Sequence, residues 1–126
     1  MLLETICNEK VPPLELPLLK FASSLWISDW EPLLPMLLNT ATSPEFRAMC
    51  FHATISYCLL QQARLARNLY NVQNIGLAGG VFQNQLLTNT ALEWLIADGF
   101  KVALPINVPM NDAGISYGQV IEFAKI

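Results

Sequence analysis

The feature that most constrains this chain is a short apolar run that ends on two adjacent glycines. Residues 75–78 are typical of a buried strand, Gly79 and Gly80 follow, and a helical pattern runs over residues 83–98. Paired glycines permit a positive φ and a close approach of ligand to backbone, and a helix N-terminus offers N–H groups to an anion. The pattern therefore predicts a strand, a tight turn and a helix start suited to a phosphate. A purely structural turn is the alternative.

A second polar turn lies further along the chain. Residues 100–104 predict a strand parallel to the first, because right-handed crossovers connect such strands, and the turn at residues 109–119 opens another helix. Two helix starts at the ends of neighbouring strands face one crevice, which is where open α/β sheets bind ligands. The Gly-Lys-Ser/Thr and Gly-x-Gly-x-x-Gly patterns of the usual nucleotide folds are absent from the sequence.

Five stretches of the sequence form one combined pattern. They are Gly79-Gly80-Val81-Phe82-Gln83-Asn84, Asp98-Gly99-Phe100, Pro109-x-Asn111-Asp112-x-Gly114-Ile115-x-x-Gly118-Gln119, Trp30-Glu31-Pro32-Leu33-Leu34 and Phe51-His52-Ala53-Thr54. The first three stretches, in this order and spacing, resemble the C-terminal end of the hydrogenase-maturation carbamoyltransferase family HypF, and the last two also match that family's pattern, so the resemblance covers residue 29 to the end of the chain. Ala113 stands where the family usually has a second glycine, which is a mild change at a helix start.

The resemblance implies an α/β fold. The chain would be a C-terminal lobe fragment of an actin-like ATPase (ASKHA, Kae-like) fold, in which a few strands, including a parallel pair, pack with about four to five helices. Its 126 residues suffice for one domain with a modest core. We therefore expect a single domain over residues 1–126, with a helix end and a strand pair in residues 1–28 and a helical βαβα part in residues 29–126.

The resemblance also implies an activity for the whole enzyme. A separate domain makes carbamoyl-adenylate from carbamoyl phosphate and ATP. The domain that corresponds to this chain delivers the carbamoyl group to the C-terminal cysteine of a HypE-like partner protein, where it becomes the cyanide ligand of [NiFe] hydrogenase. The whole enzyme would use ATP and a divalent metal, whereas we expect this chain alone to be inactive and to bind no cofactor.

Individual residues inherit roles from the same resemblance. Nucleotide phosphate or ribose would be held by Gly79, Gly80, Val81 and Asn84, and one metal ligand would be Asp112. A carboxylate oxygen suits a cation that also bridges phosphate oxygens, although Asp112 would serve equally well as the N-cap of the final helix. The family's other metal ligands are a histidine pair in the other lobe, and this chain has one histidine. The metal site is therefore expected to be incomplete here, and no catalytic residue is assigned.

The amino-acid composition limits the kinds of partner that we expect for this chain. Apolar residues make up 53% and charged residues 13% of the chain, against about 45–50% and about 25% in typical soluble domains. We therefore expect either deep packing or a face hidden against another surface, and predict a homodimer. The net charge of -3 without a Lys/Arg cluster argues against nucleic acid. Prolines and charges interrupt the most apolar region, residues 11–38, so no membrane span is expected.

The cysteines and the N-terminus indicate a compartment. Cys7, Cys50 and Cys58 form no Cys-x-x-Cys pair and are predicted to be reduced core residues of a cytoplasmic protein. The first residues lack a basic region ahead of an apolar segment, so no signal peptide is predicted.

Local signals predict the remaining elements. Residues 14–18 and 24–28 are expected to form a strand pair joined at residues 20–23, with Pro17 at an edge. Asp29 is the expected N-cap of a short helix that ends at residue 38. Ser43-Pro44-Glu45 predicts the start of a long helix that runs to about residue 69.

Apolar stripes predict how the helices pack. The stripe of the long helix comprises Phe46, Met49, Cys50, Ala53, Leu60 and Ala63, with Arg47, Gln61, Arg64 and Arg67 largely off it. The helix over residues 83–98 presents Leu87, Ala91, Trp94 and Leu95 and stops at Gly99, and the last helix presents Ile115, Val120, Ile121 and Ala124. His52 is expected to have a structural, hydrogen-bonded role, since buried polar groups are normally paired.

Two functions from different classes remain open at this point. The chain is either the C-terminal lobe of a carbamoyltransferase or a non-catalytic interaction module whose glycine pair makes a structural turn. Flanking sequence with an acylphosphatase-like domain, zinc-finger cysteines and a histidine pair would support the first function. A chain that begins and ends here would support the second.

Overall fold

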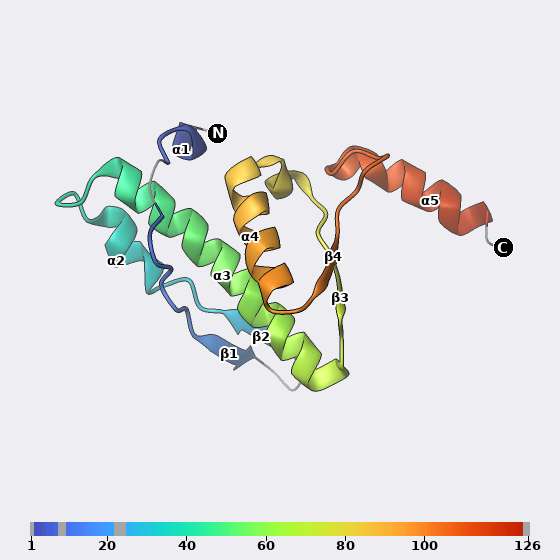
Figure 1. Ribbon diagram of the computed structural model, residues 1–126, viewed down its shortest axis with the longest axis horizontal. Helices are drawn as coiled ribbons and strands as arrows, with labels where there is room; N and C mark the ends of the chain where they lie inside the picture. The colour runs from blue at the N-terminus through green and yellow to red at the C-terminus, as the bar shows by residue number, and fades with distance from the viewer. Residues whose placement is uncertain (1, 8–9, 22–24, 125–126) are drawn as a thin grey trace.

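The long helix α3 (Pro44–Tyr70) is the element against which most of the chain packs. The computed structural model describes residues 2–7, 10–21 and 25–124 (Figure 1). The helices α1 (Leu2–Thr5), α2 (Leu33–Leu38) and α4 (Gln85–Ala97) all contact α3. The last helix, α5 (Ile115–Ala124), extends away from this body (Figure 1).

The strands form two separate pairs. β1 (Leu18–Phe21) runs antiparallel to β2 (Leu25–Ser28), whereas β3 (Asn74–Gly76) runs parallel to β4 (Lys101–Ala103), with Ile75 opposite Val102. The pairing of β3 with β4 continues for one residue, because the N–H of Leu77 donates to the carbonyl of Ala103 at 3.0 Å. Helix α4 makes the crossover between β3 and β4. The predicted parallel pair is confirmed.

The main core lies between α3, α4 and the β3–β4 pair. Its buried members are Leu60, Ala63, Leu77, Ala91, Leu95 and Phe100, and a smaller cluster of Leu16, Leu33 and Cys58 lies under α2. The predicted stripe of α3 is confirmed except at Phe46, which is 42% exposed. Phe46 lies in the first turn of α3, ahead of the part of the helix that its neighbours cover, where burial begins at Ala48.

Both ends of α3 are fixed by the signals that its sequence carries. The hydroxyl of Ser43 accepts from the N–H of Phe46 at 3.1 Å, and Pro44 occupies the first helical position. At the other end, Asn71 adopts a left-handed conformation with φ of 56° and donates its N–H to the carbonyl of Arg67. The predicted helix is therefore confirmed.

The N-terminal strand pair lies later than predicted. Residues 14–17 form no strand, because Leu16 packs into the core at 2% exposure and Pro17 has no N–H to give to a partner strand. β1 begins only at Leu18, so the predicted turn over residues 20–23 is wrong at Lys20 and Phe21, and its remainder lies outside the described residues.

The start of α2 also differs from the prediction. The carboxylate of Asp29 accepts from the N–H of Glu31 at 3.0 Å and so caps the turn that precedes the helix. α2 itself begins at Leu33 with Pro32 as its N-cap residue, and Pro32 offers no side-chain hydrogen bond. The prediction that Asp29 caps this helix is therefore wrong, because residues 30–32 form a turn in which the N–H groups of Leu33 and Leu34 donate to the carbonyls of Trp30 and Glu31.

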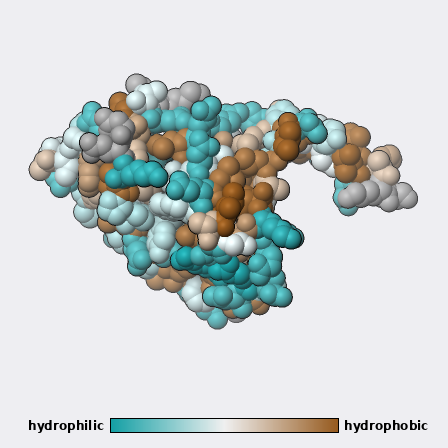
Figure 2. All heavy atoms as spheres, viewed as in Figure 1, coloured by the Kyte–Doolittle hydropathy of each residue, from teal (hydrophilic) through white to brown (hydrophobic). Residues whose placement is uncertain are grey.

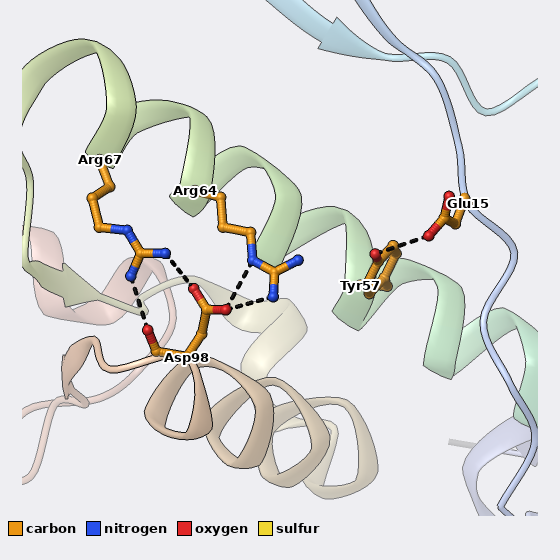
Figure 3. Close-up of polar contacts among 5 residues, drawn as sticks. All are labelled: Glu15, Tyr57, Arg64, Arg67 and Asp98. Atoms are coloured by element: carbon orange, nitrogen blue, oxygen red, sulfur yellow. Dashed lines mark hydrogen bonds and ion pairs between the residues drawn. The ribbon is translucent and has the colours of Figure 1, made fainter.

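A cluster of charged groups fixes the C-terminal end of α4 on α3 (Figure 3). The carboxylate of Asp98 accepts from Nε of Arg64 at 2.9 Å and from the guanidinium of Arg67 at 2.6 Å. The hydrogen bond from Arg64, more than that from Arg67, holds the pKa of Asp98 below its ordinary value. Arg67 also donates to the carbonyl of Asp98 and lies over the ring of Phe100 at 4.3 Å. These arginines, predicted to lie off the stripe, join two helices.

Helix α5 buries none of its residues. Ile115, Tyr117, Val120, Ile121 and Phe123 are all exposed large apolar side chains. In the space-filling view, apolar atoms gather on this extension, apart from the body of the molecule (Figure 2). Among the described residues, no helix is both long and apolar enough to cross a membrane.

Candidate functional site

A groove of about 360 Å³ lies at the carboxyl ends of β3 and β4. One wall is the turn after β3, with Ala78 and Gly79, and the other is the loop after β4, between Pro105 and Ile115. The two polar turns that the sequence singles out therefore face the same crevice, as expected for the ends of neighbouring parallel strands.

Backbone contacts join the two walls. The N–H of Gly79 donates to the carbonyl of Met110 at 2.6 Å, and Gly79 has a φ of +116°, which side chains with a Cβ rarely adopt. Gly80 lies beside Asn111, since a Cβ at Gly80 would stand 3.8 Å from the Cβ of Asn111. Glycine is thus required at 79 by conformation, whereas at 80 a methyl group would fit but would fill space next to the groove wall.

A 3-10 turn, η1 (Gly80–Gln83), separates the glycine pair from α4. The N–H of Phe82 donates to the carbonyl of Gly79, and the N–H of Asn84 donates to that of Val81, both at 3.1 Å. Helix α4 begins at Gln85, so the prediction that it begins at Gln83 is wrong by two residues. The reason is that residues 80–83 form i→i+3 hydrogen bonds of a 3-10 turn instead of joining the helix. Within the described part of the chain, the N–H groups of Gly80 and Val81 meet no acceptor.

The N-terminus of α4 itself is already satisfied. The side-chain oxygen of Asn84 accepts from the N–H of Leu87 at 2.9 Å. The carboxylate of Glu4, from α1, accepts from the N–H groups of Gln85 at 2.7 Å and Leu86 at 3.1 Å. Any anion at this helix start would have to displace Glu4, so the free amides near the groove are those of Gly80 and Val81.

Asn84 connects the turn to the buried face of α3. Its Nδ2 lies 2.8 Å from Nε2 of His52, whose Nδ1 lies 2.8 Å from the carbonyl of Ala48. His52 is 4% exposed. The structural, hydrogen-bonded role expected for His52 is confirmed, and its partner is a residue that the sequence assigns to nucleotide binding.

Asp112 lies at the start of the short turn η2 (Asp112–Gly114) and is exposed. The N-cap of this turn is Asn111, whose side-chain oxygen accepts from the N–H of Ala113 at 3.1 Å. The final helix, α5, begins only at Ile115, so the alternative that Asp112 is its N-cap is wrong. The Asp112 carboxylate meets no partner among the described residues.

Gly114 packs closely against the groove loop. A Cβ at this position would stand 2.7 Å from the carbonyl oxygen of Pro109, a distance that real Cβ atoms do not show. The family pattern places glycine here, and the structure supplies the reason, because only a residue without a Cβ permits this approach of backbone to backbone.

The cysteines contribute no metal or nucleophilic site. Cys50 and Cys58 are buried, and Sγ of Cys7 lies 3.8 Å from Nδ1 of His52. Burial raises the pKa of the Cys7 and Cys58 thiols, and the charge of Glu4 raises that of Cys7 further. No group of three or more His, Cys, Asp or Glu side chains in the described residues could hold a metal ion.

Two of the contacts at this site could not be predicted from the sequence. Glu4 reaches the start of α4 from 81 residues away, and His52 reaches Asn84 from 32 residues away. An acidic side chain ahead of a short helix and a lone histidine in a helix are both common. Only the packing of α1 and α4 on α3 brings them to the glycine turn.

The fold and this groove define a class of protein. A family model described as "Carbamoyltransferase, Kae1-like Domain, second subdomain" matches residues 1–119. The chain belongs to this carbamoyltransferase family.

The named relatives are HypF proteins. The chain is 31% identical over 88 residues to the probable carbamoyltransferase HypF of Methanocaldococcus jannaschii and 33% identical over 90 residues to carbamoyltransferase HypF2 of Cupriavidus necator. Each match covers 70% of this chain and 11% of the relative, so the chain spans about a tenth of their length.

A solved structure shares the fold over nearly the whole chain. The crystal structure of full-length HypF in the phosphate- and nucleotide-bound form matches with a TM-score of 0.89 and 30% identity. The match covers 98% of this chain and 20% of that protein. The expected α/β fold with a parallel strand pair is confirmed.

Proposed function

We propose that this chain supplies the phosphate-binding wall of a nucleotide site in a full-length carbamoyltransferase of hydrogenase maturation. One observation carries the proposal: the free N–H groups of Gly80 and Val81 directly follow Gly79, which lines the groove, and Gly80 lies beside Asn111 of the groove loop. Adjacent backbone N–H groups form a concave anion site without any side chain. The related HypF structure in the phosphate- and nucleotide-bound form supports a nucleotide as the ligand.

The four nucleotide-binding residues then have different tasks. Gly80 and Val81 donate to phosphate oxygens, and Gly79 sets the backbone direction through its positive φ and its bond to Met110. Asn84 shapes the turn, because both ends of its amide are engaged within the protein. In this proposal Asn84 acts on the ligand through the loop rather than by direct contact.

Asp112 would supply one ligand to a divalent cation. Its carboxylate is exposed and unpartnered at the groove, and a carboxylate oxygen is the ligand type that Mg²⁺ and similar hard cations prefer. The described residues offer no cluster that could complete such a site, so the remaining ligands would come from the nucleotide and from other parts of the enzyme. The cation would neutralise phosphate charge, and Asp112 would fix it at the groove.

The reaction that fits this site is transfer of a carbamoyl group from carbamoyl-adenylate to the C-terminal cysteine of a HypE-like partner protein. The sulfur–carbon bond forms, the bond between the carbamoyl carbon and the phosphate oxygen breaks, AMP leaves and the thiol proton is released. This chain's part is to hold the phosphate of the leaving AMP, which stabilises the charge that develops on it. The activated nucleotide would be made elsewhere in the enzyme from carbamoyl phosphate and ATP.

Substitution of Gly80 tests this proposal. In the full-length enzyme that carries this chain, Gly80→Val should raise the dissociation constant for ATP at least tenfold, because the side chain fills the approach to the amides. Gly76→Val is the matched control, since a Cβ at Gly76 in β3 meets nothing within 4 Å. Carbamoyl transfer that survives Gly80→Val at normal nucleotide affinity would contradict the proposal and favour an interaction module with a structural glycine turn.

A further inference from the structure

We propose that His52 is a positioning residue that sets the conformation of the nucleotide loop through Asn84. The proposal rests on the nucleotide-binding function proposed above, but its structural part can be tested without a nucleotide. His52 contributes no atom to the groove. It acts from the buried face of α3, behind the turn that the glycine pair opens.

The hydrogen bonds assign each atom of this relay. The side-chain oxygen of Asn84 accepts from the N–H of Leu87, which leaves its Nδ2 to donate to Nε2 of His52. His52 must then be neutral, with its proton on Nδ1, from which it donates to the carbonyl of Ala48 at 2.8 Å. Every polar atom of both side chains has a role, so neither amide flip nor the other tautomer satisfies the network.

The relay controls the loop because Asn84 joins two elements. Asn84 ends η1 through its N–H and begins α4 through its side chain. If the Asn84 side chain loses its acceptor, Nε2 of His52, it is free to rotate, and the cap on Leu87 is then lost with it. The amides of Gly80 and Val81 belong to the same short turn, so their directions depend on the position of Asn84.

Other contacts locate the junction but do not replace His52. The hydroxyl of Thr88 donates to the carbonyl of Phe82 at 2.8 Å, and Glu4 binds the first amides of α4. Neither contact involves the side-chain amide of Asn84. Phe51 lies edge-on to the imidazole at 5.6 Å and Cys7 lies beside it, so the ring is fixed in orientation.

Four variants test the proposal by NMR of the 126-residue chain. His52→Leu removes the acceptor, His52→Gln keeps a side-chain oxygen that can accept from Asn84, and Asn84→Ala removes the other partner. Thr54→Val is the control: Thr54 is also buried on α3, but its hydroxyl accepts from the N–H of Leu14, away from the glycine turn.

The wild-type chain should show a neutral His52 with the proton on Nδ1 in nitrogen-detected spectra. His52→Leu and Asn84→Ala should shift the amide signals of residues 79–82 in the same direction and speed hydrogen exchange at Leu87 about tenfold, while His52→Gln restores most of both effects. A double variant that combines His52→Leu with Asn84→Ala should exchange at Leu87 no faster than the faster of the two single variants. A proton on Nε2, or loop signals that Thr54→Val moves as much as His52→Leu does, would overturn the proposal.

A nucleotide titration separates this proposal from the function on which it rests. In the full-length enzyme, His52→Leu should weaken ATP binding about tenfold, and His52→Gln should leave it within about threefold. If the wild-type enzyme binds no nucleotide, the proposed function fails, while the NMR measurements still decide whether His52 positions the loop. If nucleotide binds equally well to the wild type and to His52→Leu, the positioning role is wrong and the nucleotide site stands.

Discussion

Helix α4 follows the glycine turn and helix α5 follows the groove loop, yet the two helices are held in opposite ways. α4 buries Leu87, Thr88, Ala91 and Leu95 against the body, and its ends are fixed by Glu4 and Asn84 at the start and by the arginines at Asp98. α5 buries nothing and is attached through the loop that carries Asp112. The turn that leads into α4 is therefore anchored through α4 to the body, whereas the loop that leads into α5 makes a few backbone contacts near Gly79 and Gly114.

This difference between α4 and α5 indicates which contacts hold the glycine turn and which hold the Asp112 loop. The glycine turn is held by α4, which packs on α3 through the main core. The Asp112 loop ends in a helix with a large exposed apolar surface, and such surfaces in stable proteins are usually covered by another protein surface. We therefore expect the Asp112 side of the groove to be fully ordered only when α5 is covered.

The largest effect expected from this comparison is on core substitutions. Leu95→Ala removes a side chain that is 1% exposed between α3 and α4, and should lower the free energy of unfolding by about 2–5 kcal/mol. Val120→Ala, in α5 at 65% exposure, should change it by less than about 0.5 kcal/mol. Urea denaturation measures both, and equal losses would show that α5 is packed in solution.

The next effect concerns the ion pairs of Asp98 with Arg64 and Arg67 at the end of α4. Asp98→Asn removes the charge that Arg64 and Arg67 share and should cost about 1–3 kcal/mol in the free energy of unfolding at neutral pH. The pKa of Asp98 is lowered in the folded state, so the stabilisation is present above the ordinary carboxyl pKa of about 3.9 and is lost as the pH falls through the lowered value. Acid denaturation should therefore separate the wild type from Asp98→Asn at neutral pH and bring them together at low pH. A difference in the free energy of unfolding between the two proteins that widens on acidification would contradict this role of Asp98.

The parts of the fold that could be predicted from the sequence are those set by residues close to one another along the chain. The start of α3 was predicted correctly because Ser43 and Pro44 act within one turn, and Gly99 stops α4 as expected with a φ of +89°. The cap predicted for Asp29 was wrong because the residues between it and Leu33 form a turn of their own.

The long-range contacts of the candidate site could not be predicted. The glycine turn and the groove follow from the order of strands and helices, and both were expected. The occupation of the α4 start by Glu4 and the link from Asn84 to His52 depend on helix packing, which no local pattern encodes. Asn84 was predicted to touch nucleotide on the family pattern alone, and its contacts now favour a role within the loop.

Gly114, at the groove loop, and Gly118, in α5, allow a comparison of two substitutions on the Asp112 side of the groove. Gly114→Ala places a Cβ against the carbonyl of Pro109 and should destabilise the groove loop by about 1–3 kcal/mol. Gly118→Ala meets nothing within 4 Å in the middle of α5 and should stabilise that helix by about 0.5–1 kcal/mol. Limited proteolysis of the loop would report both changes, with faster cleavage for Gly114→Ala and slower cleavage for Gly118→Ala. Equal cleavage of the two variants would show that the close approach to Pro109 does not order the loop.

The smallest effect expected is on association. We predict that the 126-residue chain forms a homodimer at micromolar concentration through its exposed apolar surface, since burial of such surface contributes about 25 cal/mol per Å². Phe123→Ser, at a side chain that is 79% exposed, should weaken the dimer several-fold without unfolding it. Light scattering that shows a monomer at high micromolar concentration would rule this out.

The most direct test of the nucleotide site is a structure of the full-length enzyme with ADP and Mg²⁺. We predict that phosphate oxygens lie within about 2.7–3.2 Å of the backbone nitrogens of Gly80 and Val81, and that the Asp112 carboxylate binds the cation. His52 and Asn84 should keep the hydrogen bond described here. A nucleotide bound away from the turn after β3, or a phosphate held only by side chains while these two amides stay free, would contradict the central claim.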